Sequence, residues 1–245
     1  MIPRIFISSE NISNDIAIIG GSDVNYLKNV MRLKTGDDVT VIDGKNREYS
    51  SKILSLEKDL ASVKLISENK VLTASKVKVT IAQGLPKNPK MDLIVQKATE
   101  LGAAKIIPVK TERSLIKLVG EKETNKINRW QIIAKEAAEQ SGRSSIPVVS
   151  EIMDFDEVIE LCKSHDKCIM LWEMEKEMTL KKYFHKNSNI EDLLVLIGPE
   201  GGFSQKEAEL AKEKGFEMIN IGKRILRTET APLAVLSMID YEFEQ

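Results

Sequence analysis

The sequence predicts an α/β protein in which a small β-rich unit precedes a larger domain built on a parallel sheet. Two observations predict this class. Residues 1–72 contain short strand-like segments separated by turn signals, whereas the rest of the chain alternates apolar strands with helical stretches. The periodicity changes near Val71 to Ser75, so we expect one domain over residues 1–72 and a second over residues 73–245.

The N-terminal domain is expected to be mostly β-structure. Strand-like segments are PRIFI and VTVIDGKNREYSSKILSLEKDLASVKLI, and Gly-Asp and Asp-Gly pairs at residues 36–37 and 43–44 mark turns. Residues 24–33 (VNYLKNVMRL) instead have helical spacing. We expect a short helix there, with an apolar stripe that contains Val24, Leu27, Val30 and Met31.

The C-terminal domain shows a βαβ pattern. Its strand-like segments are KVKVTIAQ, AKIIPV, KCIMLW, LLVLIG and FEMINI. Five apolar residues between the first two segments follow helical spacing: Met91, Ile94, Val95, Ala98 and Leu101. The stretch from Leu193 to Ile197 is continuously apolar, as is typical of a strand covered by helices on both faces. These features together predict a parallel sheet.

The composition is that of an ordinary globular protein, with 42% hydrophobic and 30% charged residues among 245. The net charge is −1, so any attraction to nucleic acid must come from a local basic patch. No apolar run reaches the roughly 18 residues that a membrane span needs, and the start, MIPRIFISSE, lacks the apolar core of a secretory signal. We therefore expect a cytoplasmic protein without membrane association.

The cysteine and histidine residues do not indicate a metal or hydrolase site. Cys162 and Cys168 flank His165 with a spacing that fits neither a disulfide framework nor a zinc site with enough ligands. His165 and His185 have no serine or cysteine partner nearby of the kind a hydrolase triad requires. We expect no metal.

A glycine-rich loop follows the most apolar strand, in LLVLIGPEGGFSQKE. The strand ends at Gly198, the chain turns through residues 199–202, and Ser204 and Glu207 have the S-x-x-E spacing of a helix capping box. Free backbone N–H groups at the carboxyl edge of a parallel sheet are a usual place for a small ligand. The loop matches neither a phosphate-binding P-loop nor a G-x-G-x-x-G fingerprint. Taken alone, its glycines are better explained by a tight turn.

A second loop, INIGKRILRTETAP, repeats this layout before the final helix. Thr230 is a plausible N-cap, and Pro232 is tolerated in the first turn of a helix. Capping does not explain Arg227 and Glu229, which either form a solvated salt bridge with each other or contact a ligand.

Several segments, in the same order, resemble the RsmE family. They are IPRIFI, KMDLIVQKATELGAAKIIPV, TERS at residues 111–114, EAAEQSGR at residues 136–143, GPEGGFSQKE and IGKRILRTETAPLAVLS. These SPOUT-class enzymes use S-adenosylmethionine to methylate N3 of a uridine in small-subunit (16S) ribosomal RNA. The resemblance implies a PUA-like β-barrel for RNA, a SPOUT methyltransferase domain with a C-terminal trefoil knot, and a homodimer. The nearly all-apolar stretch from Leu233 to Phe243 agrees with a helix that packs on a partner subunit.

The resemblance also implies roles for individual residues. Backbone groups of the two loops would hold the adenine, and the cofactor would lie among Leu171, Gly198, Pro199, Glu200, Gly201, Gly202, Ile221, Gly222, Ile225, Leu226, Arg227 and Thr230. For catalysis, Arg227 would stabilise negative charge on the uracil oxygens, and Glu229 would accept the N3 proton or orient Arg227.

Basic residues in segments that resemble the family are candidates for RNA contact. They are Arg4, Arg32, Lys87, Arg113 and Arg143, with Lys34 and Lys90 as further candidates. A scattered solvated surface is the competing explanation, and for any single lysine it is the better one. Where relatives commonly have histidine, this chain has Tyr26, whose ring can still stack on a base.

Two alternatives remain open. One is a SPOUT enzyme that methylates a ribose 2′-hydroxyl, although the early Asn-Gly-Arg type motif of such enzymes is absent from VTIAQGLPKNPKMD. The other is a non-catalytic RNA-binding protein of ribosome assembly, which the intact glycines of both loops disfavour.

Overall fold

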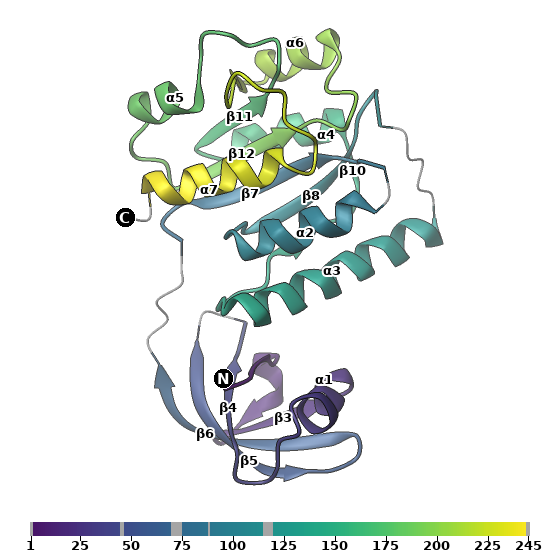
Figure 1. Cartoon of the computed structure of the whole chain (residues 1–245), viewed down its shortest axis with the longest axis vertical. Coiled ribbons are helices and arrows are strands. Elements are labelled where there is room, and N and C mark those ends of the chain that lie inside the picture. The colour runs from purple at the N-terminus through teal and green to yellow at the C-terminus, as the bar shows by residue number, and fades with distance from the viewer. Residues whose placement is uncertain (1, 45–46, 70–74, 88, 115–119, 244–245) are drawn as a thin grey trace. The chain divides into compact units, whose positions relative to one another are not determined.

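The structure, a computed structural model, describes residues 2–44, 47–69, 75–87, 89–114 and 120–243 (Figure 1). Its contacts group the chain into two units. The first is Met1–Ala74 with Ala138–Ile146, and the second is Ser75–Ala137 with Pro147–Gln245. The expected boundary between residues 72 and 73 lies outside the described residues and stays a prediction.

The first unit is a six-stranded sheet with the order β1-β4-β5-β6-β3-β2. Its strands are β1 (Arg4–Phe6), β2 (Ile12–Ser13), β3 (Ile16–Gly20), β4 (Asp38–Ile42), β5 (Glu48–Leu56) and β6 (Leu60–Asn69). β1 pairs with β4 in parallel and the other pairs are antiparallel. Inward residues alternate along the strands, as Ala17 and Ile19 do in β3, and they form one apolar core.

The expected helix of the first unit differs from the structure in its second half. A short α1 (Ser22–Asn25) continues into η2 (Tyr26–Val30), a π-helical turn in which Met31 N donates to Tyr26 O at 2.9 Å. Val24 and Leu27 are buried as expected, but Val30 is 63% exposed. The prediction for Val30 is wrong because a π turn holds more residues than an α turn and rotates Val30 away from the core.

The second unit contains a seven-stranded parallel sheet with the order β10-β8-β7-β12-β11-β13, and β9 also pairs with β8. The strands are β7 (Lys78–Gly84), β8 (Lys105–Lys110), β9 (Val148–Val149), β10 (Met153–Asp154), β11 (Lys167–Leu171), β12 (Asp192–Ile197) and β13 (Glu217–Ile219). The predicted parallel sheet is confirmed, including the strand from Leu193 to Ile197, which is buried throughout.

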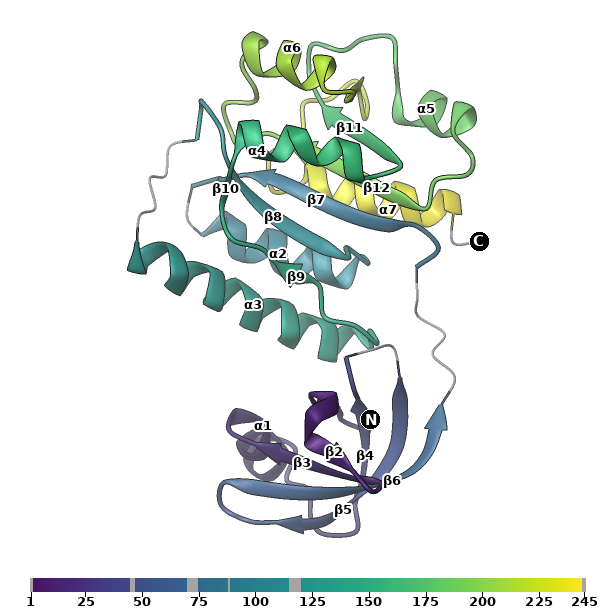
Figure 2. The ribbon, with the colours of Figure 1, turned by 180° about the vertical axis from the view of Figure 1, so that it is seen from behind.

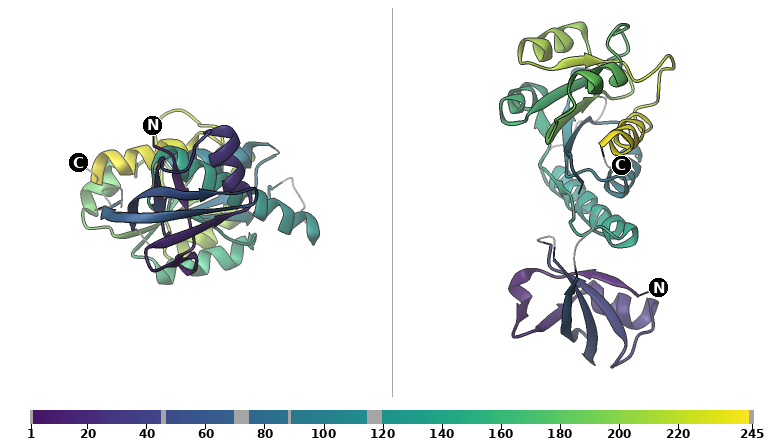
Figure 3. Two further views of the ribbon diagram at one scale, coloured as in Figure 1. Left: turned by 90° about the horizontal axis from the view of Figure 1, so that it is seen from below. Right: turned by 90° about the vertical axis from the view of Figure 1, so that its left-hand side faces the viewer.

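Helices cover both faces of this sheet. The α-helices after β7 are α2 (Lys90–Glu100), α3 (Glu121–Ser141), α4 (Phe155–Glu160), α5 (Leu180–Lys186), α6 (Gln205–Glu213) and α7 (Ala231–Phe243). A 3-10 turn, η3 (Leu161–Ser164), follows α4, and another, η1 (Ser9–Asn11), belongs to the first unit. α2 and α7 lie on one face, and α4 and α6 lie on the other (Figures 2 and 3). The α4 and α6 side forms a core with the strands through Phe155, Val158 and Ala211.

One cysteine prediction is wrong. The structure pairs Cys162 with Cys168 as a disulfide, with Cα atoms 5.7 Å apart. Cys162 lies in η3 and Cys168 in the following strand, β11, so the turn between them returns the chain and brings the two sulfurs together. Within the described residues, no cluster of three or more His, Cys, Asp or Glu side chains suits a metal ion, and no helix has the length and apolarity to cross a bilayer.

Candidate active site

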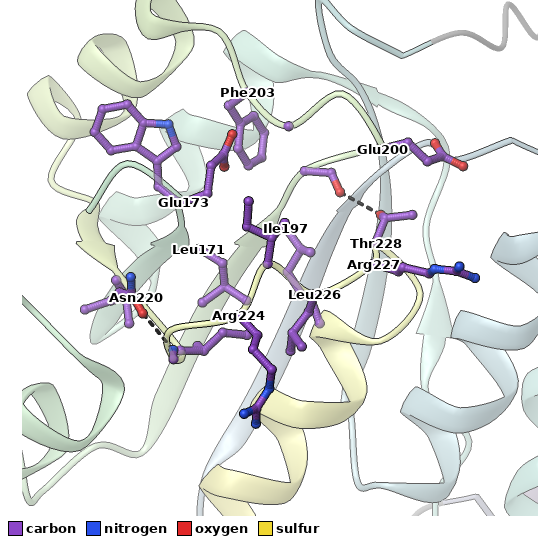
Figure 4. Close-up of a pocket in the computed structure, with 18 of the residues that line it drawn as sticks. Leu171, Glu173, Ile197, Glu200, Phe203, Asn220, Arg224, Leu226, Arg227 and Thr228 are labelled. Atoms are coloured by element: carbon purple, nitrogen blue, oxygen red, sulfur yellow. Dashed lines mark hydrogen bonds between the residues drawn. The ribbon is translucent and has the colours of Figure 1, made fainter. Parts of the chain in front are cut away.

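Three neighbouring strands of the second unit end at the same edge of the sheet and open a cavity of about 840 Å³ (Figure 4). β11 ends at Leu171, β12 at Ile197 and β13 at Ile219. The chain that follows each strand lines the cavity, at residues 172–176, 198–203 and 220–228. Parallel strands place their carboxyl ends together, so the sheet topology itself brings these segments to one place.

The loop at residues 198–202 is packed so closely that side chains would not fit. A Cβ atom on Gly84, at the end of β7, would lie 2.6 Å from Cδ and 2.8 Å from N of Pro199. A Cβ on Gly198 would lie 3.1 Å from Cα of Gly202. Gly202 has a φ of +63°, and a Cβ there would meet the Glu173 carboxylate at 2.7 Å. The glycines therefore do more than form a turn, because they let the loop pack closely against β7 and Glu173.

Two buried polar side chains connect this loop to the second loop. Oγ1 of Thr228 donates to the Gly198 carbonyl at 2.7 Å. The fully buried amide nitrogen of Gln83 lies 3.2 Å from the same carbonyl and 3.0 Å from Thr228 Oγ1. Buried donors and acceptors that satisfy one another in this way fix the relative position of the two loops.

A separate network supports the outer side of the first loop. Ser204 and Glu207 form the expected capping box of α6, which confirms that prediction. Ser204 Oγ also donates to the Glu112 carboxylate at 2.7 Å, and Glu207 accepts from the Glu112 backbone N–H at 2.9 Å. Arg113 Nη1 donates to the Gly201 carbonyl at 2.9 Å. The TERS segment thus holds the loop from outside.

The charged side chains near the second loop do not form the Arg227–Glu229 salt bridge that was one of the two sequence hypotheses, and contact with a ligand stays a prediction. Glu229 pairs with Lys90, whose Nζ lies 3.0 Å from Glu229 Oε2 and 3.1 Å from Glu200 Oε1. Burial raises the pKa of Glu229, but the Lys90 ammonium and the nearby Arg227 charge outweigh it and the pKa is lowered. Arg227 itself is exposed and has no side-chain hydrogen bond or ion pair within the part of the chain that the structure describes.

The structure brings most of the predicted cofactor residues to the cavity. Its lining includes Leu171, Gly198, Pro199, Glu200, Gly201, Gly202, Ile221, Gly222, Ile225, Leu226 and Arg227. Leu171, Ile197 and Leu226 point toward one another and form an apolar wall (Figure 4). Ile225 is 86% exposed. Thr230 and Glu229 do not line the cavity, and the Thr230 carbonyl accepts from Ala234 N at 3.0 Å, in the first turn of α7.

The predicted RNA-contacting residues lie in both units. Arg4 pairs with Glu48 at 2.6 Å, Arg32 is exposed, and Arg143 is partly buried, which lowers its pKa to about 10. Lys87 and Arg113 lie beside the first glycine loop, because the Lys87 backbone N–H donates to Glu200 at 3.1 Å and Arg113 donates to Gly201. Their RNA contacts stay predictions.

Sequence reasoning missed Gln83, Gly84 and the position of Lys90 at the cavity. Gln83 and Gly84 are the last two residues of the strand segment KVTIAQG. A polar residue at the carboxyl end of a buried strand could have indicated a binding site there. Lys90 is the first residue of α2, where a cation opposes the helix dipole. That unfavourable placement was the signal that could have identified it.

The cavity fits S-adenosylmethionine chemically. Apolar side chains suit the faces of adenine, and backbone groups of the two loops that line the cavity suit hydrogen bonds to its edge. Charged side chains of both signs at the rim, Glu173, Lys176 and Arg224, suit the ammonium and carboxylate of the methionine part.

Comparisons with known proteins show which family the chain belongs to. An RNA methyltransferase domain family matches residues 73–240, and an RNA methyltransferase PUA domain family matches residues 19–66. The chain is 39% identical over 233 residues to ribosomal RNA small subunit methyltransferase E of Bacillus subtilis, covering 92% of this chain and 90% of that protein.

Two solved structures are also similar. The chain is 30% identical, with a TM-score of 0.90, to ribosomal RNA small subunit methyltransferase E of Neisseria gonorrhoeae bound to S-adenosylmethionine, covering 99% and 98% of the two chains. A Legionella pneumophila protein crystallised with the same cofactor is 30% identical, with a TM-score of 0.90 and 98% of each chain covered.

Proposed function

The chain belongs to the family of ribosomal RNA small subunit methyltransferase E, and on this premise we propose that it methylates N3 of a uridine in 16S ribosomal RNA. S-adenosylmethionine supplies the activated methyl group. The observation that carries the proposal is the cavity at the ends of β11, β12 and β13, which is lined by both glycine-bearing loops.

We propose that Arg227 acts directly in methyl transfer. Loss of the N3 proton places negative charge on the neighbouring uracil oxygens, and a guanidinium is suited to hold such oxygens with parallel hydrogen bonds. Arg227 lines the cavity, is exposed, and has no side-chain partner among the described residues, so its donors are available to a substrate.

Glu229 is better suited to remain a charged carboxylate that acts on neighbouring side chains than to accept the N3 proton. The ion pair with Lys90 lowers the pKa of its carboxyl, which makes the carboxylate a weaker base. Its side chain is 16% exposed and lies outside the cavity lining, which supports the same assignment.

The quaternary structure and the chain path remain proposals from family membership. We propose a homodimer that uses α7, where Met238 is 41% and Tyr241 71% exposed on a mostly apolar helix. We likewise propose that the segment after β13 passes through the trefoil knot of SPOUT enzymes. The RNA contacts of Arg4, Arg32, Lys87, Arg113 and Arg143, and a cytoplasmic location, are proposed on the same basis.

A labelling experiment tests the function. The pure protein is incubated with S-adenosylmethionine tritiated on its methyl group and with 30S subunits or naked 16S ribosomal RNA, and the RNA is digested to nucleosides. We expect the label in 3-methyluridine. Label on a ribose 2′-oxygen would instead identify a 2′-O-methyltransferase, and no label on either substrate would identify a non-catalytic RNA-binding protein.

A further inference from the structure

Lys90 joins the two loops of the cavity through its charge. It is the first residue of α2, yet its ammonium contacts Glu200 of the first loop at 3.1 Å and Glu229 of the second at 3.0 Å. The Lys90 side chain is 30% exposed and that of Glu229 is 16% exposed, so solvent screens this pair less than an ordinary surface pair.

Helix stability does not explain this lysine. The N-terminal end of a helix carries partial positive charge, so an acidic or neutral residue is preferred at its first position. The lysine is tolerated because two carboxylates compensate its charge. The position of Lys90 is therefore better explained by its effect on the two carboxylates, which would seek another cation if the lysine were absent.

Without Lys90, Glu229 would have Arg227 as its nearest cation in the second loop. The two residues are two positions apart, and the Arg227 charge already lowers the pKa of Glu229 although no ion pair joins them. A carboxylate that loses its cation in a partly buried site is left uncompensated, and pairing with Arg227 would restore the compensation. An Arg227 paired with Glu229 would have its hydrogen-bond donors occupied and its charge compensated.

We propose that Lys90 is a positioning residue that holds Glu229 away from Arg227, so that the Arg227 guanidinium stays available for the anionic pyrimidine. This inference rests on the role proposed for Arg227 in methyl transfer. Lys90 lines the cavity, but both of its ion pairs are made within the protein, so this role differs from the RNA-contacting role that its basic side chain suggests.

The kinetic test compares Lys90→Met and Lys90→Gln with the wild type and with Lys90→Arg. We expect both neutral variants to lower kcat by about 10- to 100-fold, somewhat less than complete loss of an electrostatic donor, while KM for S-adenosylmethionine changes by less than about 3-fold. Lys90→Arg restores the charge and should keep kcat within about 3-fold of the wild type.

Lys97→Met is the matched control. Lys97 lies on the same helix, is 37% exposed, and pairs with a single carboxylate, that of Glu100, at 2.8 Å. Its loss removes one lysine charge from α2 without releasing a carboxylate beside Arg227, so kcat should stay unchanged. The proposal would be overturned if the neutral Lys90 variants had the same kcat as Lys97→Met. It would also be overturned if these variants raised KM for S-adenosylmethionine and left kcat unchanged.

A crystal structure of Lys90→Met gives a readout that does not depend on activity. We expect a guanidinium nitrogen of Arg227 within about 4 Å of a Glu229 carboxylate oxygen, the distance of an ion pair. An Arg227 that remains unpaired in this variant refutes the inference even if kcat falls. Failure of the wild type to methylate uridine would refute the proposed function instead, and the crystal structure would still decide whether Lys90 separates the two side chains.

Discussion

At the scale of single residues, Arg227 is distinguished because no carboxylate of the described residues forms an ion pair with its charge. Its neighbour Glu229 pairs with Lys90, and no described residue forms a hydrogen bond or ion pair with the guanidinium, which projects away from the apolar wall of the cavity (Figure 4). A charged group without a protein partner is suited to a charge that develops only during the reaction.

Replacing Arg227 should therefore affect turnover more than cofactor binding. We expect Arg227→Ala to lower kcat by about 100-fold or more, and Arg227→Lys by about 10-fold, because lysine keeps the charge but not the planar pair of donors. Calorimetry should give a Kd for S-adenosylmethionine within about 3-fold of the wild type for both. Wild-type turnover by Arg227→Ala would show that the electrostatic assignment is wrong.

Gly84 gives a second prediction at this scale. The Cβ of Gly84→Ala would lie 2.6 Å from Pro199 Cδ, so the loop at residues 198–202 must move away from β7. Overpacking of this kind costs about 1–3 kcal/mol, and we expect the Kd for S-adenosylmethionine to rise by about 10-fold or more. Gly20→Ala is the control, because its Cβ would meet nothing closer than 3.9 Å. Equal Kd values for the two variants would exclude the close approach as a requirement for binding.

At the scale of elements, the start of α6 determines how firmly the first loop is held. Ser204 both caps the helix, by accepting from Glu207 N at 3.2 Å, and donates to Glu112 at 2.7 Å. One hydroxyl thus connects the helix, the glycine loop that precedes it and the TERS segment.

Ser204→Ala should destabilise the second unit by about 1–2 kcal/mol, since it removes a cap and leaves Glu112 without this donor. The urea midpoint measures the change, and Ser204→Thr should recover most of it. Thr179→Ala, which removes only the cap bond to Lys182 N in α5, should cost less. A larger loss for Thr179→Ala would mean that the Glu112 contact adds nothing.

Much of the second unit could be predicted from sequence because its signals are local. Continuous apolar runs predicted the parallel strands, and Ser204 with Glu207 predicted the start of α6. In the first unit, the exposure of Val30 could not be predicted, since the apolar spacing of the segment gave no sign that its second half forms a π turn. The Lys90–Glu229 pair joins residues far apart in the chain, and no periodicity encodes such a contact.

At the scale of the whole molecule, every residue that lines the cavity belongs to the second unit. Cofactor binding should therefore stabilise that unit selectively. At about 100 times Kd, a ligand slows hydrogen exchange through complete opening by about 100-fold. We expect this slowing for the amides of β7 and β12 and none for those of β3 and β6, measured by mass spectrometry of peptides. Equal slowing in both units would contradict a site confined to the second.

The proposed dimer gives a prediction at the same scale. Met238→Glu places a charge on the exposed apolar side of α7 and should convert a dimer into monomers of 27.5 kDa, measured by light scattering. Ile132→Glu is the matched control, because Ile132 is also an exposed apolar residue, at 58%, but lies on α3. Dissociation by the control alone would move the interface to α3.

The pairing of β7 with β12 has a consequence for how the protein is made. Lys78 and Asp192, whose side chains pair across these strands, are 114 positions apart, and the second loop and α7 follow later still. Because contacts between such distant segments form only after both have been made, a nascent chain must be synthesised past the second loop before its binding site exists. The methyl donor therefore cannot bind to, or stabilise, the earlier strands of the second unit until the second loop has been synthesised.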